Sequence, residues 1–210
     1  MTLNVSRALG PIVLATLVAM PIAANAASSF QTGTGTLNAS AAVDFTITIP
    51  KVLFLQVGTG SLFANNSSVN VITFSVPAAS VGNGTAVAAT AGSGDIGNGT
   101  VTARVFGNGG AAVSLSATNG GALSDGAGNT ISWGQITTTA SALAGVPTLL
   151  NPITLVNGAA TPVSLPAVSG VVNQGAQWTY SYANTATPVG GTYGGVNTNN
   201  GRVTYTATLP

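Results

Sequence analysis

Few side chains in this sequence are able to do chemistry, and they stand far apart. The 210-residue chain contains no histidine and no cysteine, and 3% of its residues are charged. Nucleophiles activated by histidine are therefore excluded, and zinc loses its two favoured ligands. Acid-base catalysis would fall to Asp44, Asp95 and Asp125, none of which lies in a signature of paired carboxylates. We expect no catalytic residue, and the chain is not predicted to be an enzyme.

Two glycine-rich stretches resemble ligand loops but favour ordinary turns. Residues 92–97 match the dinucleotide pattern G-x-G-x-x-G, yet Asn98-Gly99 and an alternating strand follow in place of the helix that would hold a pyrophosphate. Residues 125–129 offer oxygen ligands to calcium, but one carboxylate falls short of the roughly six to eight oxygens that calcium takes. We therefore expect no cofactor and no bound metal.

Three aromatic residues are candidates for a ligand platform: Trp133, Trp178 and Tyr182. Aromatic faces with a polar tip suit a wet surface that binds sugars. Trp178, Tyr180 and Tyr182 alternate along one strand face, however, and the same alternation is typical of a sandwich core or of a ladder between strands. Both interpretations stay open at the level of the sequence.

Alternation with a period of two dominates the chain beyond residue 40 and predicts strands, which Asn-Gly pairs separate by tight reversals. The expected strands cover residues 43–49, 52–57, 69–76, 101–106, 111–117, 129–136, 177–183 and 202–209. Residues 137–169 are less regular, and they form either short edge strands at 153–156 and 162–165 or a long packed connection. The expected core is the apolar phase of these strands: Phe45, Ile47, Phe54, Ile72, Phe74, Val105, Val113, Leu115, Trp178, Tyr180 and Tyr205. The predicted fold class is all-β, an antiparallel immunoglobulin-like β-sandwich of about 7–10 strands.

The first residues are typical of a signal for export. Arg7 precedes an apolar run at 12–20, and Ala24-Asn25-Ala26 supplies the small residues of a cleavage site. The run is shorter than the roughly 20 residues needed to span a bilayer. We predict a signal peptide at 1–26, a flexible arm at 27–40 and a single β-sandwich domain at 41–210. The mature protein is expected in the bacterial periplasm, at the cell surface or outside the cell.

The charges that remain after residue 26 exclude two classes of partner. Three aspartates balance Lys51, Arg104 and Arg202, and these three cations are isolated from one another. They cannot form the cationic surface that binds nucleic acid, nor the polybasic patch that binds anionic lipid. We expect no nucleic acid partner, and a mature form that does not span a membrane.

One alternating segment is a candidate assembly strand. Its apolar members are Val43, Phe45, Ile47 and Ile49, and polar residues stand between them. Such a segment offers backbone hydrogen bonds and a row of apolar side chains together. It is either the first strand of the domain's own sandwich or a strand given to a neighbouring copy, and the low charge of the chain favours association.

The alternating segment 41–49 behind a loose arm, together with the alternating final strand 202–209, resembles the pilin-type immunoglobulin-like subunits of bacteria. Residues 131–136 are similar to the sheet segments of cell-surface domains from that broad group. The resemblance implies an exported structural or cell-surface subunit of a fimbria-like filament, assembling by β-strand addition with copies of itself or related subunits. Alternatives are an adhesin module that binds carbohydrate or another surface and, less favoured, an outer-membrane β-barrel.

Overall fold

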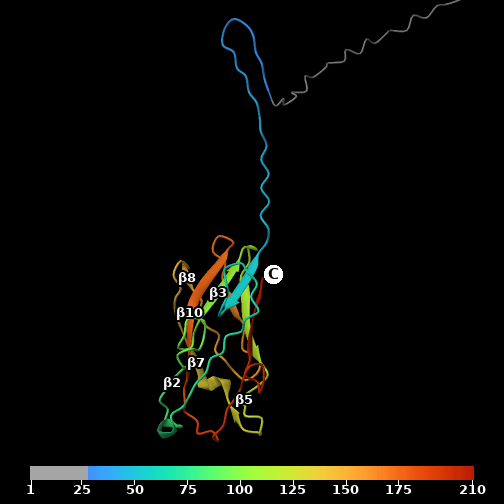
Figure 1. Ribbon diagram of the computed structural model, residues 1–210. Coiled ribbons are helices and arrows are strands. Elements are labelled where there is room, and N and C mark those ends of the chain that lie inside the picture. Colours follow the sequence, from blue (N-terminus) through green and yellow to red (C-terminus); the bar gives the residue numbers. More distant parts are fainter. Residues whose placement is uncertain (1–27) are drawn as a thin grey trace, which may run out of the picture. The chain divides into compact units, whose positions relative to one another are not determined.

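The computed structural model describes residues 28–210, which fall into two compact units. The second unit, Pro50–Pro210, contains all the described strands, and the first is described over residues 28–49 (Figure 1). The predicted signal peptide lies outside the described residues. Between residues 28 and 210, no helix has both the length and the apolar character to cross a membrane.

The second unit is all-β, as the alternation predicts. Its strands are β1 (Leu53–Val57), β2 (Val87–Ala88), β3 (Thr100–Gly107), β4 (Val113–Asn119), β5 (Leu123–Ser124), β6 (Thr130–Ile131), β7 (Ile136–Ala142), β8 (Thr148–Leu149), β9 (Val163–Leu165), β10 (Val172–Tyr182) and β11 (Val203–Thr208). Two short 3-10 helices, η1 (Ala78–Ser80) and η2 (Trp133–Gln135), are the helical elements of the described chain.

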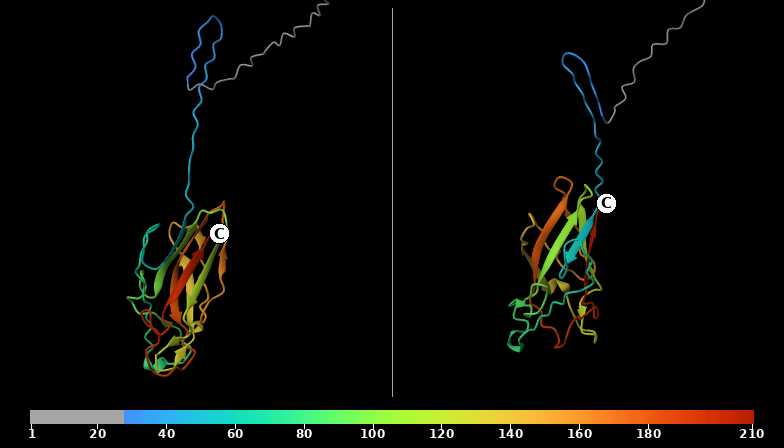
Figure 2. Two further views of the ribbon diagram at one scale, coloured as in Figure 1. Left: turned by 90° about the vertical axis from the view of Figure 1, so that its right-hand side faces the viewer. Right: turned by 45° about the horizontal axis from the view of Figure 1, so that its top comes forward.

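The strands form two main sheets (Figures 1 and 2). In the first, β10 lies between β3 and β7, with β1 beyond β3, and β2 and the parallel β8 also pair with β10. In the second, β4 lies between β11 and β9. All other strand pairs are antiparallel, including the small pair β5–β6.

The core lies between the two sheets, and alternate residues of the central strands fill it. Val105 and Trp178 enter it from the first sheet, and Val113 and Leu115 enter it from the second; all four are fully buried. The Trp178 indole N–H donates to the carbonyl of Leu150 at 2.7 Å, so its one polar atom is satisfied inside the core. Tyr180 is also buried, which confirms this part of the predicted core.

The alternating stretch 69–76 differs from its prediction. It forms an isolated bridge, Phe74 to Ala89, in place of a strand, and Ile72 and Phe74 are half-buried. Residues 136–142 form the strand β7, which the sequence did not predict. Three threonines in succession and a serine occupy β7, so it lacks the apolar alternation that marks β3 and β10.

The described part of the first unit contains no strand. The exposed fractions of Val43, Phe45, Ile47 and Ile49 are 75%, 87%, 84% and 75%. The prediction that Phe45 and Ile47 are buried is therefore wrong, because a period of two orders the side chains without supplying a partner to cover them. The second compact unit begins at Pro50, whereas the sequence places the start of the single domain at residue 41.

The Asn108 side chain fixes the start of the second unit. Its amide nitrogen donates to the carbonyl of Pro50 at 2.8 Å, and its oxygen accepts from the backbone N–H of Val52 at 2.6 Å. Both bonds come from the loop that follows β3. The residues that lead into β1 are thereby attached to the first sheet.

Candidate assembly site

The structure does not bring the few titratable residues together. Asp44 is exposed in the first unit, Asp95 accepts from the backbone N–H of Thr102 at 2.9 Å, and Lys51 donates to the carbonyl of Pro210. Within residues 28–210, no cluster of three or more acidic, histidine or cysteine residues could hold a metal ion. The absence of enzymatic activity stays a prediction.

Asp125 acts as a turn residue. Its carboxylate accepts from the backbone N–H groups of Ala127 at 2.8 Å and Asn129 at 3.0 Å, and from the side-chain amide of Asn129 at 2.7 Å. The bond from the Asn129 side chain is the largest cause that lowers the pKa of Asp125. The loop's own donors therefore engage the oxygens that a calcium ion would need.

The glycine-rich stretch 92–97 is a loop that enters a strand, as predicted. Gly94 donates its backbone N–H to the carbonyl of Val71, and Ile96 donates to the carbonyl of Thr100. Amides engaged in this way are not free to bind phosphate. Asn98 and Gly99 both adopt positive φ, which makes the reversal into β3.

The aromatic residues proposed as a ligand platform lie in the core. Trp133, Trp178 and Tyr182 are all buried, and the indole N–H of Trp133 donates to the carbonyl of Gly121 at 2.9 Å. These three side chains therefore do not form an exposed sugar-binding surface. Their positions agree with the alternative interpretation, a sandwich core.

The first sheet ends at β7 on one side and at β1 on the other. The edge on the β1 side has two parts, one after the other along the sheet. The first part is β1, which forms a ladder with β3. The second part is Val71 to Phe74, which bonds to the residues that follow β2: Phe74 bridges Ala89, and the carbonyls of Thr73 and Val71 accept from Thr90 and Gly94. Both β3 and β2 pair with β10, on the side of β10 away from β7. Residues 58–70 form a loop that leaves this edge after β1 and returns to it.

The second sheet has β11 at one end and β9 at the other, and the edge considered next is β11. It pairs with β4 alone, with Tyr205 opposite Ala117 and Ala207 opposite Leu115. The inward residues Val203, Tyr205 and Ala207 remain half-buried, whereas the inward residues of β4 are buried. β11 therefore has one edge of backbone groups that no strand of the described chain pairs with, while its apolar face packs on the core, where the Tyr205 ring lies beside Trp178.

These two free edges meet at the boundary between the sheets. A Cβ built on Gly107 would lie 3.4 Å from Leu209, just beyond β11, and 3.7 Å from Leu53 of β1. Lys51 and Pro210 close one end by their hydrogen bond. No backbone hydrogen bond joins β1 to β11 within the described residues. We call this unpaired boundary between β1 and β11 the seam.

Two tyrosines connect the sheets beside the seam. The hydroxyls of Tyr180 and Tyr205 lie 3.0 Å apart, and the rings of Trp178 and Tyr205 have centroids 5.5 Å apart. Burial raises the pKa of Tyr180 well above its usual value, and nearby Tyr205 adds to the shift. Burial also raises the pKa of Tyr205. Both tyrosines therefore keep their protons at neutral pH.

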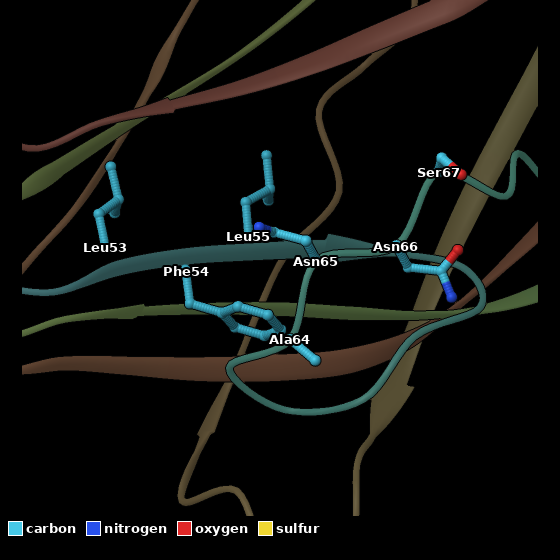
Figure 3. A pocket seen from close by; sticks show the side chains of 7 residues that line it. All are labelled: Leu53, Phe54, Leu55, Ala64, Asn65, Asn66 and Ser67. Atoms are coloured by element: carbon cyan, nitrogen blue, oxygen red, sulfur yellow. The ribbon is translucent and has the colours of Figure 1, made fainter.

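The loop 58–70 returns over the edge of β1. The Phe63 ring packs against Phe54 and Phe106 on the outer face of the first sheet, with centroids 5.6 Å and 5.1 Å apart. Residues 64–67 and the side chains of Leu53, Phe54 and Leu55 line a cavity of about 560 Å³ (Figure 3). Side chains from both faces of β1 meet this cavity, and β3 occupies the opposite edge of the strand. The cavity therefore lies at the free edge of β1.

Comparisons of the chain with protein-family models, curated proteins and solved structures found no match. The site therefore has to be interpreted from its own geometry. The sequence identified the alternating segment 43–49 and the final strand, but it missed the seam and the loop over β1. Those two features depend on contacts between residues far apart in the chain, and no local pattern marks them.

Proposed function

We propose that this protein is an exported structural subunit of the bacterial cell surface, with an immunoglobulin-like sandwich and a filament-forming role. Copies join when residues 43–49 of one chain enter the seam of the next as an added strand. Partners are copies of the same chain or related subunits. The exposed alternating segment carries this proposal, because four large apolar side chains in one phase stay uncovered in the described chain.

The donor segment has the chemistry that a sheet edge accepts. Val43, Phe45, Ile47 and Ile49 share one phase, and fully burying each such side chain contributes about 1.5–3 kcal/mol. Asp44, Thr46 and Thr48 occupy the other phase, so the outward face of an added strand would be polar. A strand with one apolar and one polar face suits a position between the core and water.

The acceptor matches the donor in length and in character. β11 contains 6 residues and extends about 20 Å, whereas residues 43–49 extend about 23 Å at about 3.3 Å per residue. The inward side chains of β11 pack on the core but stay half-buried, so a donor strand beside them would cover more of their apolar surface. An added strand would also pair with backbone groups of β11 or β1, which are the main source of affinity in strand addition.

Export and surface location are supported by the first 26 residues and by the composition. A nearly uncharged chain without histidine or cysteine provides stable β surfaces rather than a reactive centre. The carbohydrate-binding alternative has less support, because its proposed aromatic platform is buried.

The experiment that tests the proposal compares the mature protein with a Phe45→Asp variant by light scattering and electron microscopy. The parent should form multimers or filaments, and the variant should stay a folded monomer, because a carboxylate cannot enter an apolar seam without losing its hydration. Val168→Asp is the matched control, since Val168 is 72% exposed in the second unit and lies outside the donor. A monomeric parent, or equal assembly of parent and Phe45→Asp, would overturn the proposal.

A further inference from the structure

We infer that residues 59–69 form a strap over the free edge of β1 that has to lift before a donor strand can enter. This inference rests on the proposed function and adds a conformational step that controls when the donor strand can bind. The strap joins the two parts of the free edge, β1 and Val71 to Phe74. It carries three features that the fold alone does not require: an aromatic anchor, a closed base and an open hollow between its middle and β1.

The aromatic anchor is Phe63. Its φ is +59°, a region that bulky side chains rarely adopt, and its ring lies on the outer face of the sheet between Phe54 and Phe106. The side chain is still 56% exposed, so the contact covers only part of the ring. A strained backbone and a half-exposed ring indicate that the contact of Phe63 with the sheet can be broken.

The base of the strap is closed by Asn70. Its side-chain oxygen accepts from the backbone N–H of Thr59 at 2.7 Å, which ties the two ends of the strap together. Gly58 adopts a φ of +94°, and a Cβ there would overlap the Asn70 side chain. Gln56 donates to the carbonyl of Gly58 at 2.9 Å and fixes the start of the strap. The base therefore stays in place while the part beyond it can move.

The middle of the strap covers β1 without pairing to it. Residues 64–67 line the cavity of about 560 Å³ at the edge of β1, as Figure 3 shows. Among the described residues, no backbone hydrogen bond joins residues 64–67 to β1. Loops that cover an edge strand prevent unwanted pairing, and a cover without hydrogen bonds is displaced more readily than a paired strand. The strap thus shields β1 until a donor arrives.

The test measures how fast the acceptor takes up a donor. A fluorescent peptide with the sequence of residues 38–49 is mixed with the full-length mature Phe45→Asp chain, whose own donor is disabled, and anisotropy is followed over time. Adding Phe63→Ala removes both aromatic contacts of the anchor and should speed uptake roughly tenfold or more. Leu62→Ala is the matched control, since Leu62 is an exposed strap residue outside the aromatic cluster, and it should leave the rate unchanged.

A second variant tests the base independently of the anchor. Asn70→Ala breaks the bond to Thr59 and should also speed uptake, while circular dichroism checks that both strap variants keep the parent's β content. If the Phe45→Asp chain takes up the peptide at the same rate with and without Phe63→Ala or Asn70→Ala, the strap is overturned and strand addition stands. No uptake by any variant, including one in which residues 60–68 are replaced by two glycines, would overturn strand addition and the strap with it. Faster uptake in both folded variants, with Leu62→Ala unchanged, supports the inference.

Discussion

Replacing Ile47 with alanine distinguishes donation of the strand from pairing within the chain. Ile47 is 84% exposed in the free protein, so Ile47→Ala removes almost no buried surface. The free energy of unfolding of the monomer should then change by less than about 0.5 kcal/mol. If Ile47 belonged to the domain's own core, the same change would destabilise the monomer by about 2–5 kcal/mol.

The effect of Ile47→Ala on assembly should be large. With the donor in the seam, the Ile47 side chain would be buried against the half-buried apolar side chains at the edges of β11 and β1. Its loss should weaken strand binding by about 2 kcal/mol or more, which is roughly 30-fold in the dissociation constant. Thr46 points to the opposite face of the same segment, so Thr46→Ala should change binding by about 0.5 kcal/mol or less.

Two measurements check this prediction. Peptides of residues 38–49 with the parent, Ile47→Ala or Thr46→Ala sequence are titrated against the Phe45→Asp chain, and affinity is measured by anisotropy. Urea denaturation of the parent and of Ile47→Ala, both diluted until they are monomeric, gives the stability of the monomer. Equal affinities of the two variant peptides would refute the seating of Ile47 in the seam. A lower urea midpoint caused by Ile47→Ala in the monomer would show that the segment pairs with its own domain.

Three further predictions concern the second unit. Leu115→Ala should lower the free energy of unfolding by about 2–5 kcal/mol, because Leu115 is fully buried, whereas Thr208→Ala at an exposed position should change it by about 0.5 kcal/mol or less; urea denaturation measures both. Tyr180 has a pKa raised above 10.0, so above pH 10 the unfolded chain loses a proton that the folded chain keeps, and stability falls as the pH rises. Tyr180→Phe should reduce that fall, and identical pH slopes for variant and parent between pH 9 and 11 would contradict the assignment. Asn184→Ala should destabilise the protein by about 1–3 kcal/mol, because buried Asn184 accepts from the backbone of Gly82 and donates to the carbonyl of Ser80. Thermal unfolding measures the effect, and an unchanged melting temperature would show that these bonds are dispensable.

The sequence predicts strands well where one face meets the core. Alternation located β3, β4, β10 and β11, because apolar and polar residues alternate there between the core and the outside. It missed β7, where three successive threonines break the apolar alternation and the strand is defined by its pairing with β10. Local pattern thus carries information about burial more than about pairing.

The candidate site was predictable on the donor side only. The phase of Val43, Phe45, Ile47 and Ile49 is evident in the sequence, but their burial depends on a partner that local pattern does not specify. The position of the seam depends on which strands end each sheet, and that order follows from long-range pairing. The role of Phe63 could not be predicted, because no local pattern surrounds a single phenylalanine in a polar loop. Its role depends on the contacts with Phe54 and Phe106.

In a filament of the proposed kind, the Asn108 side chain would limit how far successive domains can move. Pro50, Lys51 and Val52 alone separate the donor segment from β1, and Asn108 binds the backbone of Pro50 and Val52. From Ile49 to Leu53 the chain reaches at most about 14 Å. A donor held in a neighbour's seam would therefore be joined to its own domain by a short tether, restrained at both of its ends. Tension along the filament would pass from one sheet to the next with little slack, and successive domains would have little freedom to swing.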